Sequence, residues 1–180
     1  MVTESAMSQK PVQKMYVQVY TGDGKGKTTA ALGMAVRAAG HGLKTYVGQF
    51  MKGWPYGELS ALKAHPLITI EQYGDENCIR KQDVTQAHAD RACQGLEKIR
   101  SAMASGKYDL LILDEINVAV WFGLLTEKQV TDLLDIRPEN VEMVLTGRNA
   151  PEAFIARADL VTEMKEVKHY YARGVLARRH

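Results

Sequence analysis

The sequence predicts an α/β fold in which a doubly wound, mostly parallel sheet is flanked by helices. Two observations carry this prediction. Short apolar runs alternate along the chain with stretches of helical periodicity, as they do in parallel βαβ units. One run, YDLLILDE, is almost continuously apolar until two acids close it, which is typical of a strand buried on both faces of a parallel sheet.

Six apolar runs are predicted to be strands. In chain order they are residues 15–20, 44–50, 67–73, 108–115, 141–148 and 159–164. The residues ahead of them, 1–14, carry no periodic apolar signal, and we expect them to form an N-terminal arm. The chain has 180 residues, which fits one folded domain with a sizeable core, over residues 15–180.

Helical periodicity or a helix-start signal follows most of these runs. The expected helices are residues 27–39, 58–64, 84–105, a segment that begins at the capping box TEKQ of 126–129, and 149–158. The last of them is opened by Asn149 or Pro151. Two loops, 51–58 and 74–83, remain; the first follows a strand, which makes it a candidate for ligand contact.

The composition excludes several classes of function. The net charge is +2 and the basic residues are scattered, which argues against a nucleic-acid or membrane-surface partner. A targeting leader and an apolar run of membrane-spanning length are both missing from the sequence, so we expect a cytoplasmic location. Cys78 and Cys93 have no metal-ligand spacing, and neither do the five histidines; Cys93 is predicted to be a small core residue.

The stretch YTGDGKGKTTAALG, residues 20–33, lies between the first strand and the first helix. The phosphate-loop pattern is Gly, four residues, Gly-Lys-Ser/Thr, and when it is anchored on the GKT of 26–28 it demands a glycine where Thr21 stands. The glycine comes one residue later, at Gly22. A strand before the loop, a helix after it and an acid-ended strand downstream together predict a RecA-like P-loop NTPase fold that binds a polyphosphate.

The residue types of this loop suit phosphates and a metal ion. Backbone N–H groups at a helix start favour negative charge, Lys27 adds a compact positive charge, and the Thr28 hydroxyl is placed to ligate Mg²⁺. Lys25 is either a second phosphate contact or a solvated charge. We expect the strand that ends in Asp114 and Glu115 to lie beside the first strand, so that both acids face the metal. Binding a nucleotide does not by itself distinguish hydrolysis from transfer.

Several stretches carry a family resemblance: VYTGDGKGKTTAALGMAVRAAGHG, GQFMKGWPYGE, LLILDEINVAV, VLTGRNAP, ADLVTEM and VKHYYARGVLARR. From about Tyr16 to Arg179, the chain resembles the P-loop type of ATP:corrinoid adenosyltransferases, which act on cob(I)alamin or cobyrinate precursors. The loop of that family has the pattern Thr-Gly-x-Gly-Lys-Gly-Lys-Thr-Thr. Thr21 is therefore the family's own variation of the phosphate loop.

The resemblance implies a reaction and roles for residues. The 5′-deoxyadenosyl group of ATP is transferred to the Co(I) centre of a corrinoid and triphosphate is released, in adenosylcobalamin synthesis or salvage. The nucleotide lies reversed along the loop, so that C5′ faces the corrinoid. Lys27 and Glu115 are the implied catalytic residues, and the Mg²⁺ or Mn²⁺ ligands are Thr28, Glu115 and Asp114. By position in the motif, the ATP-binding residues are Gly22, Asp23, Gly24, Lys25, Gly26, Lys27, Thr28, Thr29, Arg37 and Arg148.

The corrinoid-binding residues stay open at this point. Family members carry a Phe and a Trp in the loop before the long helix, where this chain has Cys78 and Arg80. The aromatic residues that are candidates to replace them are Tyr73, Trp54, Tyr56, Trp121 and Phe122. The resemblance further implies a homodimer whose arm, 1–14, covers the active site, and a low-potential electron donor such as a flavoprotein.

Two other functions stay open on the residues alone. A phosphotransferase or plain ATPase would move the γ-phosphate and needs an acceptor site or lid, for which the sequence offers no arginine-rich segment. A RecA-like nucleotide-binding module that grips a polynucleotide needs a basic stripe with interleaved aromatic residues, and the composition offers none.

Overall fold

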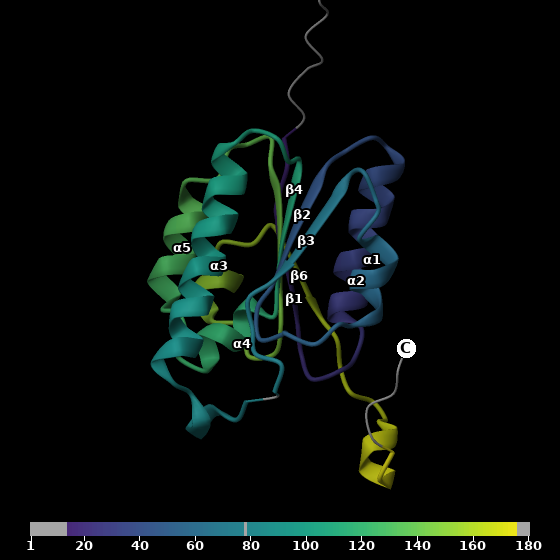
Figure 1. Ribbon diagram of the computed structural model, residues 1–180, viewed down its shortest axis with the longest axis vertical. Coiled ribbons are helices and arrows are strands. Elements are labelled where there is room, and N and C mark those ends of the chain that lie inside the picture. Colours follow the sequence, from purple (N-terminus) through teal and green to yellow (C-terminus); the bar gives the residue numbers. More distant parts are fainter. Residues whose placement is uncertain (1–13, 78, 176–180) are drawn as a thin grey trace, which may run out of the picture.

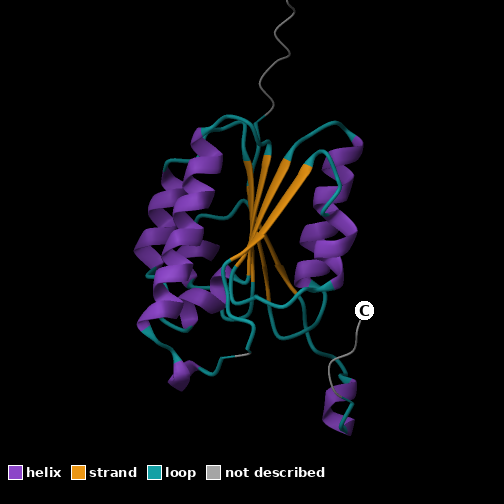
Figure 2. Cartoon of the chain, viewed as in Figure 1, coloured by secondary structure: helices purple, strands orange, loops and turns teal. Residues whose placement is uncertain are grey.

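Six parallel strands form one sheet in the computed structural model, which describes residues 14–77 and 79–175 (Figures 1 and 2). The strands are β1 (Val17–Thr21), β2 (Thr45–Gln49), β3 (Ile68–Gln72), β4 (Leu110–Asp114), β5 (Glu142–Thr146) and β6 (Leu160–Glu163). Their order in the sheet is β3-β2-β4-β5-β1-β6, and every pairing is parallel. The predicted α/β class and all six predicted strands are confirmed.

Helices cover both faces of this sheet (Figure 1). One face carries α1 (Lys27–Gly40) and α2 (Gly57–Leu62). The opposite face carries α3 (Gln86–Ala104), α4 (Ile116–Trp121) and α5 (Glu127–Asp135). The short helix α6 (Glu152–Ile155) contacts α5, and two 3-10 turns, η1 (Lys81–Asp83) and η2 (Tyr170–Arg173), lie in the loops. The layered arrangement is that of a doubly wound fold.

The core is divided between the two faces because side chains alternate along each strand. Ile112 of β4 and Val144 of β5 pack in the cluster that includes Ala31 and Ala35 of α1. Their chain neighbours point to the other face of the sheet. There Leu111, Leu113, Met143 and Leu145 belong to a second cluster with Leu96 and Ile99 of α3. Leu110–Asp114 is therefore buried throughout, as its continuous apolar run predicts.

The expected position of the acid-ended strand is wrong. β4 pairs with β2 and β5, and β5 lies between β4 and β1. The composition of a buried strand does not specify its neighbours, because strand order is set by how the crossover helices pack on the two faces. The carboxyl end of β4 nevertheless reaches the same sheet edge as that of β1.

Helix boundaries differ from the expected ones at three places. The long helix begins at Gln86, after a capping box in which Thr85 and His88 bond each other's backbone, and a 3-10 turn precedes it. Residues 149–158 hold only a four-residue helix with Pro151 at its N-cap, while Asn149 has φ 54°. Helix α4 was not expected, because INVAVW is apolar throughout and shows no helical period.

Other expectations are met or fall outside the described residues. The capping box at 126–129 is confirmed, since Thr126 N donates to Gln129 Oε1 over 2.8 Å and Gln129 N donates to Thr126 Oγ1 over 3.2 Å. Cys93 is half-buried and packs against the core, as predicted. Cys78 and residues 1–13 of the expected arm lie outside the described residues. In the described part of the chain, every helix is too short or too polar to span a membrane.

Candidate active site

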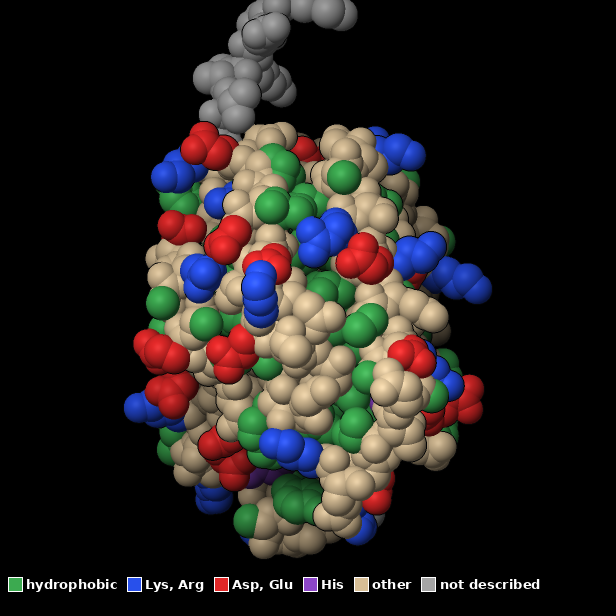
Figure 3. Space-filling model, turned by 90° about the vertical axis from the view of Figure 1, so that its left-hand side faces the viewer, with side chains coloured by type: hydrophobic (Ala, Val, Ile, Leu, Met, Phe, Trp, Pro, Cys, Tyr) green, Lys and Arg blue, Asp and Glu red, His purple; other side chains and the backbone are tan. Residues whose placement is uncertain are grey.

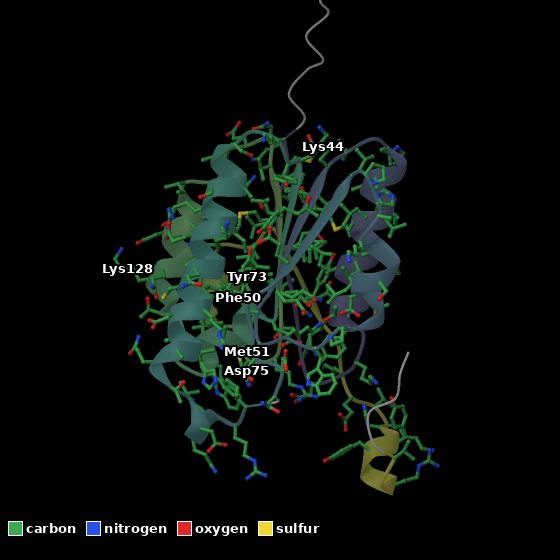
Figure 4. All side chains as sticks on the ribbon, in the orientation of Figure 1. Lys44, Phe50, Met51, Tyr73, Asp75 and Lys128 are labelled. Atoms are coloured by element: carbon green, nitrogen blue, oxygen red, sulfur yellow. The ribbon has the colours of Figure 1, made fainter. Side chains whose placement is uncertain are left out.

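The predicted site residues gather where the strands end. Figure 4 shows Lys44, which precedes β2, at one end of the sheet and Met51, which follows β2, toward the other end, beside Asp75. Met51, Glu115 and Asn149 are the non-glycine residues of the described chain with positive φ, at 57°, 61° and 54°. Each follows a strand at this edge within a few residues. Uncommon backbone conformations concentrate at functional sites, so the carboxyl edge is the candidate active site.

The phosphate loop leaves β1 at Gly22 and enters α1 after Gly26, which have φ 91° and 114°. A Cβ on Gly22 or Gly24 would lie 2.4 or 2.7 Å from the carbonyl oxygen of Met164, which accepts the N–H of Gly24 over 2.7 Å. Only glycine fits at these two positions. Thr21 still belongs to β1, so the left-handed turn falls one residue later, which explains the irregular entry of the motif.

Lys27 lies at the centre of this loop. Its Nζ donates to the carbonyl oxygens of Gly22 and Gly24 over 2.6 and 2.7 Å, and the residue is only 8% exposed. Burial lowers the pKa of Lys27 from its ordinary value, and Arg148 adds to the lowering, while Glu115 and Asp23 oppose it. The ammonium is therefore held where a phosphate chain in the loop would meet it.

The three predicted metal ligands come together at the end of β4. Asp114 is 1% exposed, and its Oδ1 accepts the hydroxyls of Thr28 over 2.9 Å and Thr146 over 2.7 Å. Glu115 follows Asp114 in the chain, and its backbone N–H donates to Thr146 Oγ1. Burial raises the pKa of Glu115, and the charge of Asp114 raises it further against the opposing cations Lys52, Lys27 and Arg148. Two carboxylates and a hydroxyl thus face one region beside the loop.

Lys52 is a site residue that the sequence reasoning missed. Its Nζ lies 2.7 Å from Asp114 Oδ2, 3.2 Å from Thr28 Oγ1 and 3.7 Å from Glu58 Oε1. Burial acts to lower the pKa of Lys52, but the charge and hydrogen bond of Asp114 outweigh it, with help from Glu58 and Glu115, and the pKa is raised. The signal was the expected ligand loop at 51–58, which follows a strand and has this lysine as its second residue.

Gln49 of β2 was missed as well. Its buried amide donates to Asp114 Oδ2 and Glu58 Oε1, each over 3.1 Å, and its Oε1 accepts from Gln72 of β3. A glutamine inside an apolar strand pattern is a signal, because a buried amide needs partners. The network ties the end of β2 to the acid of β4.

An open pocket of about 470 Å³ lies against the loop. Residues 24–29 and Glu115 form one side, and Trp121, Phe122 and Arg148 line the rest together with Val118 and Asn149. Trp121 is 47% exposed, meets Phe122 edge-to-face with ring centroids 5.3 Å apart, and has the Lys81 ammonium 4.8 Å from its ring centroid. The pocket therefore joins a polar phosphate loop to an aromatic wall.

The remaining predicted ATP residues divide into two groups. Arg148 reaches the loop, with Nη2 donating to the carbonyl oxygen of Asp23 over 3.2 Å, and Lys25 donates to Tyr170 Oη over 2.7 Å at the rim. Arg37 is not brought to this pocket. It lies in the last turn of α1, roughly 15 Å along the helix from Lys27 at 1.5 Å per residue, and lines a different cavity with Gln18 and Tyr20.

Comparison with known proteins shows the family of this chain. Residues 13–180 match the family model described as "ATP:corrinoid adenosyltransferase BtuR/CobO/CobP". The chain belongs to this family. It is 33% identical to the corrinoid adenosyltransferase of Escherichia coli K12, an alignment that covers 97% of this chain and 88% of that protein. The Sinorhizobium corrinoid adenosyltransferase is 35% identical, over 97% of this chain and 83% of that protein. The Pseudomonas aeruginosa protein of the same name is 33% identical, over 99% and 88%.

Proposed function

We propose that this chain transfers the 5′-deoxyadenosyl group of ATP to the Co(I) centre of a corrinoid and releases triphosphate. The supporting observation is that this chain, which matches the family over residues 13–180, has the phosphate loop, Lys27 and Glu115 in one pocket, with Asp114 hydrogen-bonded to Thr28 of that loop. Membership of the family indicates the class of reaction, which is ATP-dependent adenosylation of a corrinoid. A phosphotransferase and a polynucleotide-binding module are not favoured.

The electron balance of the reaction explains what the protein supplies. The Co(I) centre donates an electron pair to C5′ and forms the new cobalt–carbon bond, while the bond from C5′ to its oxygen breaks and triphosphate departs with the electron pair of that C–O bond. No proton is removed in this step, so no general base is required. Loop N–H groups, the start of α1 and Lys27 stabilise the negative charge of the leaving group, and their positions are fixed before the reaction begins.

A divalent metal ion fits the oxygens beside the loop. Thr28 Oγ1 lies 2.9 Å from Asp114 Oδ1, and the Lys52 ammonium contacts Thr28 Oγ1 and the other carboxylate oxygen, Asp114 Oδ2, so these two side chains already accept a cation. Mg²⁺ prefers a few protein oxygens together with phosphates and water. We therefore propose that Thr28, Asp114 and Glu115 hold Mg²⁺ or Mn²⁺, which when bound neutralises the triphosphate. Clusters of three or more His, Cys, Asp or Glu side chains suited to a metal are absent from residues 14–77 and 79–175.

We propose that Trp121 and Phe122 form the corrinoid side of the site. Both line the pocket of the phosphate loop, and the exposed ring of Trp121 offers an apolar surface to a flat macrocycle. The other candidates are less suited. Tyr73 is engaged with Tyr46 and Glu71, and Trp54 and Tyr56 do not line this pocket.

Replacing Trp121 with alanine is expected to weaken corrinoid binding by about tenfold or more, because a large exposed anchor is removed. Isothermal titration with cob(II)alamin in the presence of ATP measures the change. Trp54→Ala is the matched control, since Trp54 is also exposed but lies outside the pocket. A loss confined to the Trp54 variant would instead assign the corrinoid to the 51–58 loop.

The partners and location remain proposals. A low-potential electron donor such as a flavoprotein, a homodimer and a cytoplasmic location follow from the resemblance and the composition. The family model begins at residue 13, and residues 1–13 lie outside the described part of the chain, so the covering role of the arm stays a prediction. Acidic and basic side chains are interspersed over the face drawn in Figure 3, which gives no support there to a polynucleotide partner.

The decisive experiment is an anaerobic assay with chemically reduced cob(I)alamin, MgATP and purified protein. We expect the corrinoid spectrum to change to that of adenosylcobalamin while intact triphosphate appears in equal amount. Orthophosphate with an unalkylated corrinoid would contradict the proposal and would identify a γ-phosphate chemistry. Retention on single-stranded DNA that is sensitive to salt would favour the polynucleotide module.

A further inference from the structure

Lys52 neutralises the same oxygens that suit a metal ion. Its ammonium contacts Asp114 Oδ2, Thr28 Oγ1 and, at longer range, Glu58 Oε1. The side chain is 16% exposed and that of Asp114 only 1%. Lys27, the other buried lysine of the site, is bonded to loop carbonyls, and Lys25 is bonded to Tyr170 at the rim. Lys52 is therefore the cation that balances the buried charge of Asp114.

The backbone of Lys52 is held by the segment that follows β3. Gly74 N donates to the Lys52 carbonyl oxygen over 3.0 Å, and a Cβ on Gly74 would lie 2.1 Å from Lys52 N. Gly53 is packed equally closely against Asp75. The main chain of residues 52–53 is thus closely packed against the main chain that follows β3. The four-carbon stem of a lysine is flexible, so the ammonium can change position without a movement of the loop.

A divalent cation on Thr28 and Asp114 conflicts with this arrangement. The Thr28 hydroxyl donates to Asp114 and accepts from Lys52, so one of its lone pairs is already taken. An ammonium beside a divalent ion is repelled more strongly in a buried site than in water. The two cations therefore compete for the same two side chains, although Lys52 contacts Asp114 Oδ2 and Thr28 contacts Oδ1.

We propose that Lys52 is an internal counter-ion that a divalent metal must displace from Thr28 and Asp114, and whose released ammonium then pairs with the phosphates of ATP. Metal alone binds weakly because Lys52 competes for its ligands. Metal with nucleotide binds tightly because the phosphates give Lys52 a new partner. The inference rests on the proposed function in taking the nucleotide to be ATP and in taking Thr28 and Asp114 to be metal ligands.

The test compares Mn²⁺ binding by nucleotide-free wild type, Lys52→Met and the control Lys63→Met, which removes an exposed lysine at the end of α2. Free Mn²⁺ is measured by electron paramagnetic resonance. Lys52→Met is expected to bind Mn²⁺ at least about tenfold more tightly than wild type, although its melting temperature without metal is lower. With ATP present, the gain in Mn²⁺ affinity caused by ATP is expected to be larger in wild type than in the variant.

A merely structural lysine would lower stability without improving metal affinity. An Mn²⁺ affinity of Lys52→Met that falls, or that stays within about threefold of wild type, overturns the proposal. If Lys52→Met fails to fold, Lys52→Gln removes the charge but keeps a hydrogen-bond donor for Asp114, and the same titration applies. No corrinoid is used, so failure of this proposal is distinguishable from failure of the adenosyltransferase reaction.

Discussion

Lys27→Ala is expected to lower kcat/KM for ATP by about 10²–10³-fold in the corrinoid assay, the size of effect seen when one preorganised group for a developing charge is removed. The ammonium is buried and held by two loop carbonyls, so no other side chain can take its position. Both ATP binding and the departure of triphosphate depend on this charge. Steady-state kinetics under anaerobic conditions, together with calorimetric titration of ATP, separate the two contributions.

The matched control for this variant is Lys44→Ala. Lys44 is exposed and lies at the opposite end of the sheet (Figure 4). Its loss should leave kcat/KM within about twofold of wild type, because an exposed surface charge contributes little. If Lys27→Ala retained wild-type turnover while folded, the phosphate loop would not hold the triphosphate in the way that we propose.

Asp114→Asn is expected to lower the free energy of unfolding by about 3 kcal/mol, because it leaves the buried Lys52 ammonium without its closest counter-ion. The carboxylate also accepts from Thr28, Thr146 and Gln49, and an asparagine amide presents a donor to one of these donors. Urea denaturation of the ligand-free protein measures the change.

A double-mutant cycle shows whether the loss comes from the ion pair. The double variant Asp114→Asn, Lys52→Met has no unpaired buried ammonium. Its loss of unfolding free energy should therefore be clearly smaller than the sum of the losses in the two single variants. Asp132→Asn is the control, since Asp132 forms only an exposed pair with Lys128 over 2.7 Å. Strict additivity of the two buried substitutions would contradict the coupling that we describe.

The local parts of this structure could be predicted because each depends on neighbours in the sequence. The buried run of β4, the capping box at Thr126 and the glycine turn of the phosphate loop are set by periodicity, by a hydrogen-bonding pair and by φ. The same holds for Thr28, Asp114 and Glu115, because strand ends of a parallel sheet share one edge. Even with the wrong neighbour for β4, Asp114 and Glu115 lie at the carboxyl edge beside the phosphate loop, and their role as metal ligands stays a prediction.

The parts that could not be predicted depend on packing between distant segments. The order β4-β5-β1 is decided by how the crossover connections pack on the two faces of the sheet. The residue composition of a strand does not predict this packing. Helix α4 begins after a left-handed turn at Glu115, and a glutamate in the sequence does not predict a positive φ. Lys52 is found only once Asp114 is known to lie opposite it, and Arg37 appeared near the loop in the sequence but lies a helix length away.

The hydrogen bond from Gly24 to Met164 joins residues at opposite ends of the chain. The nucleotide loop follows β1, yet its main chain is held in shape by the segment that follows β6, far along the chain. We therefore expect ATP to stabilise this protein only once β6 has joined the sheet, because the loop that would hold it depends on the segment after that strand.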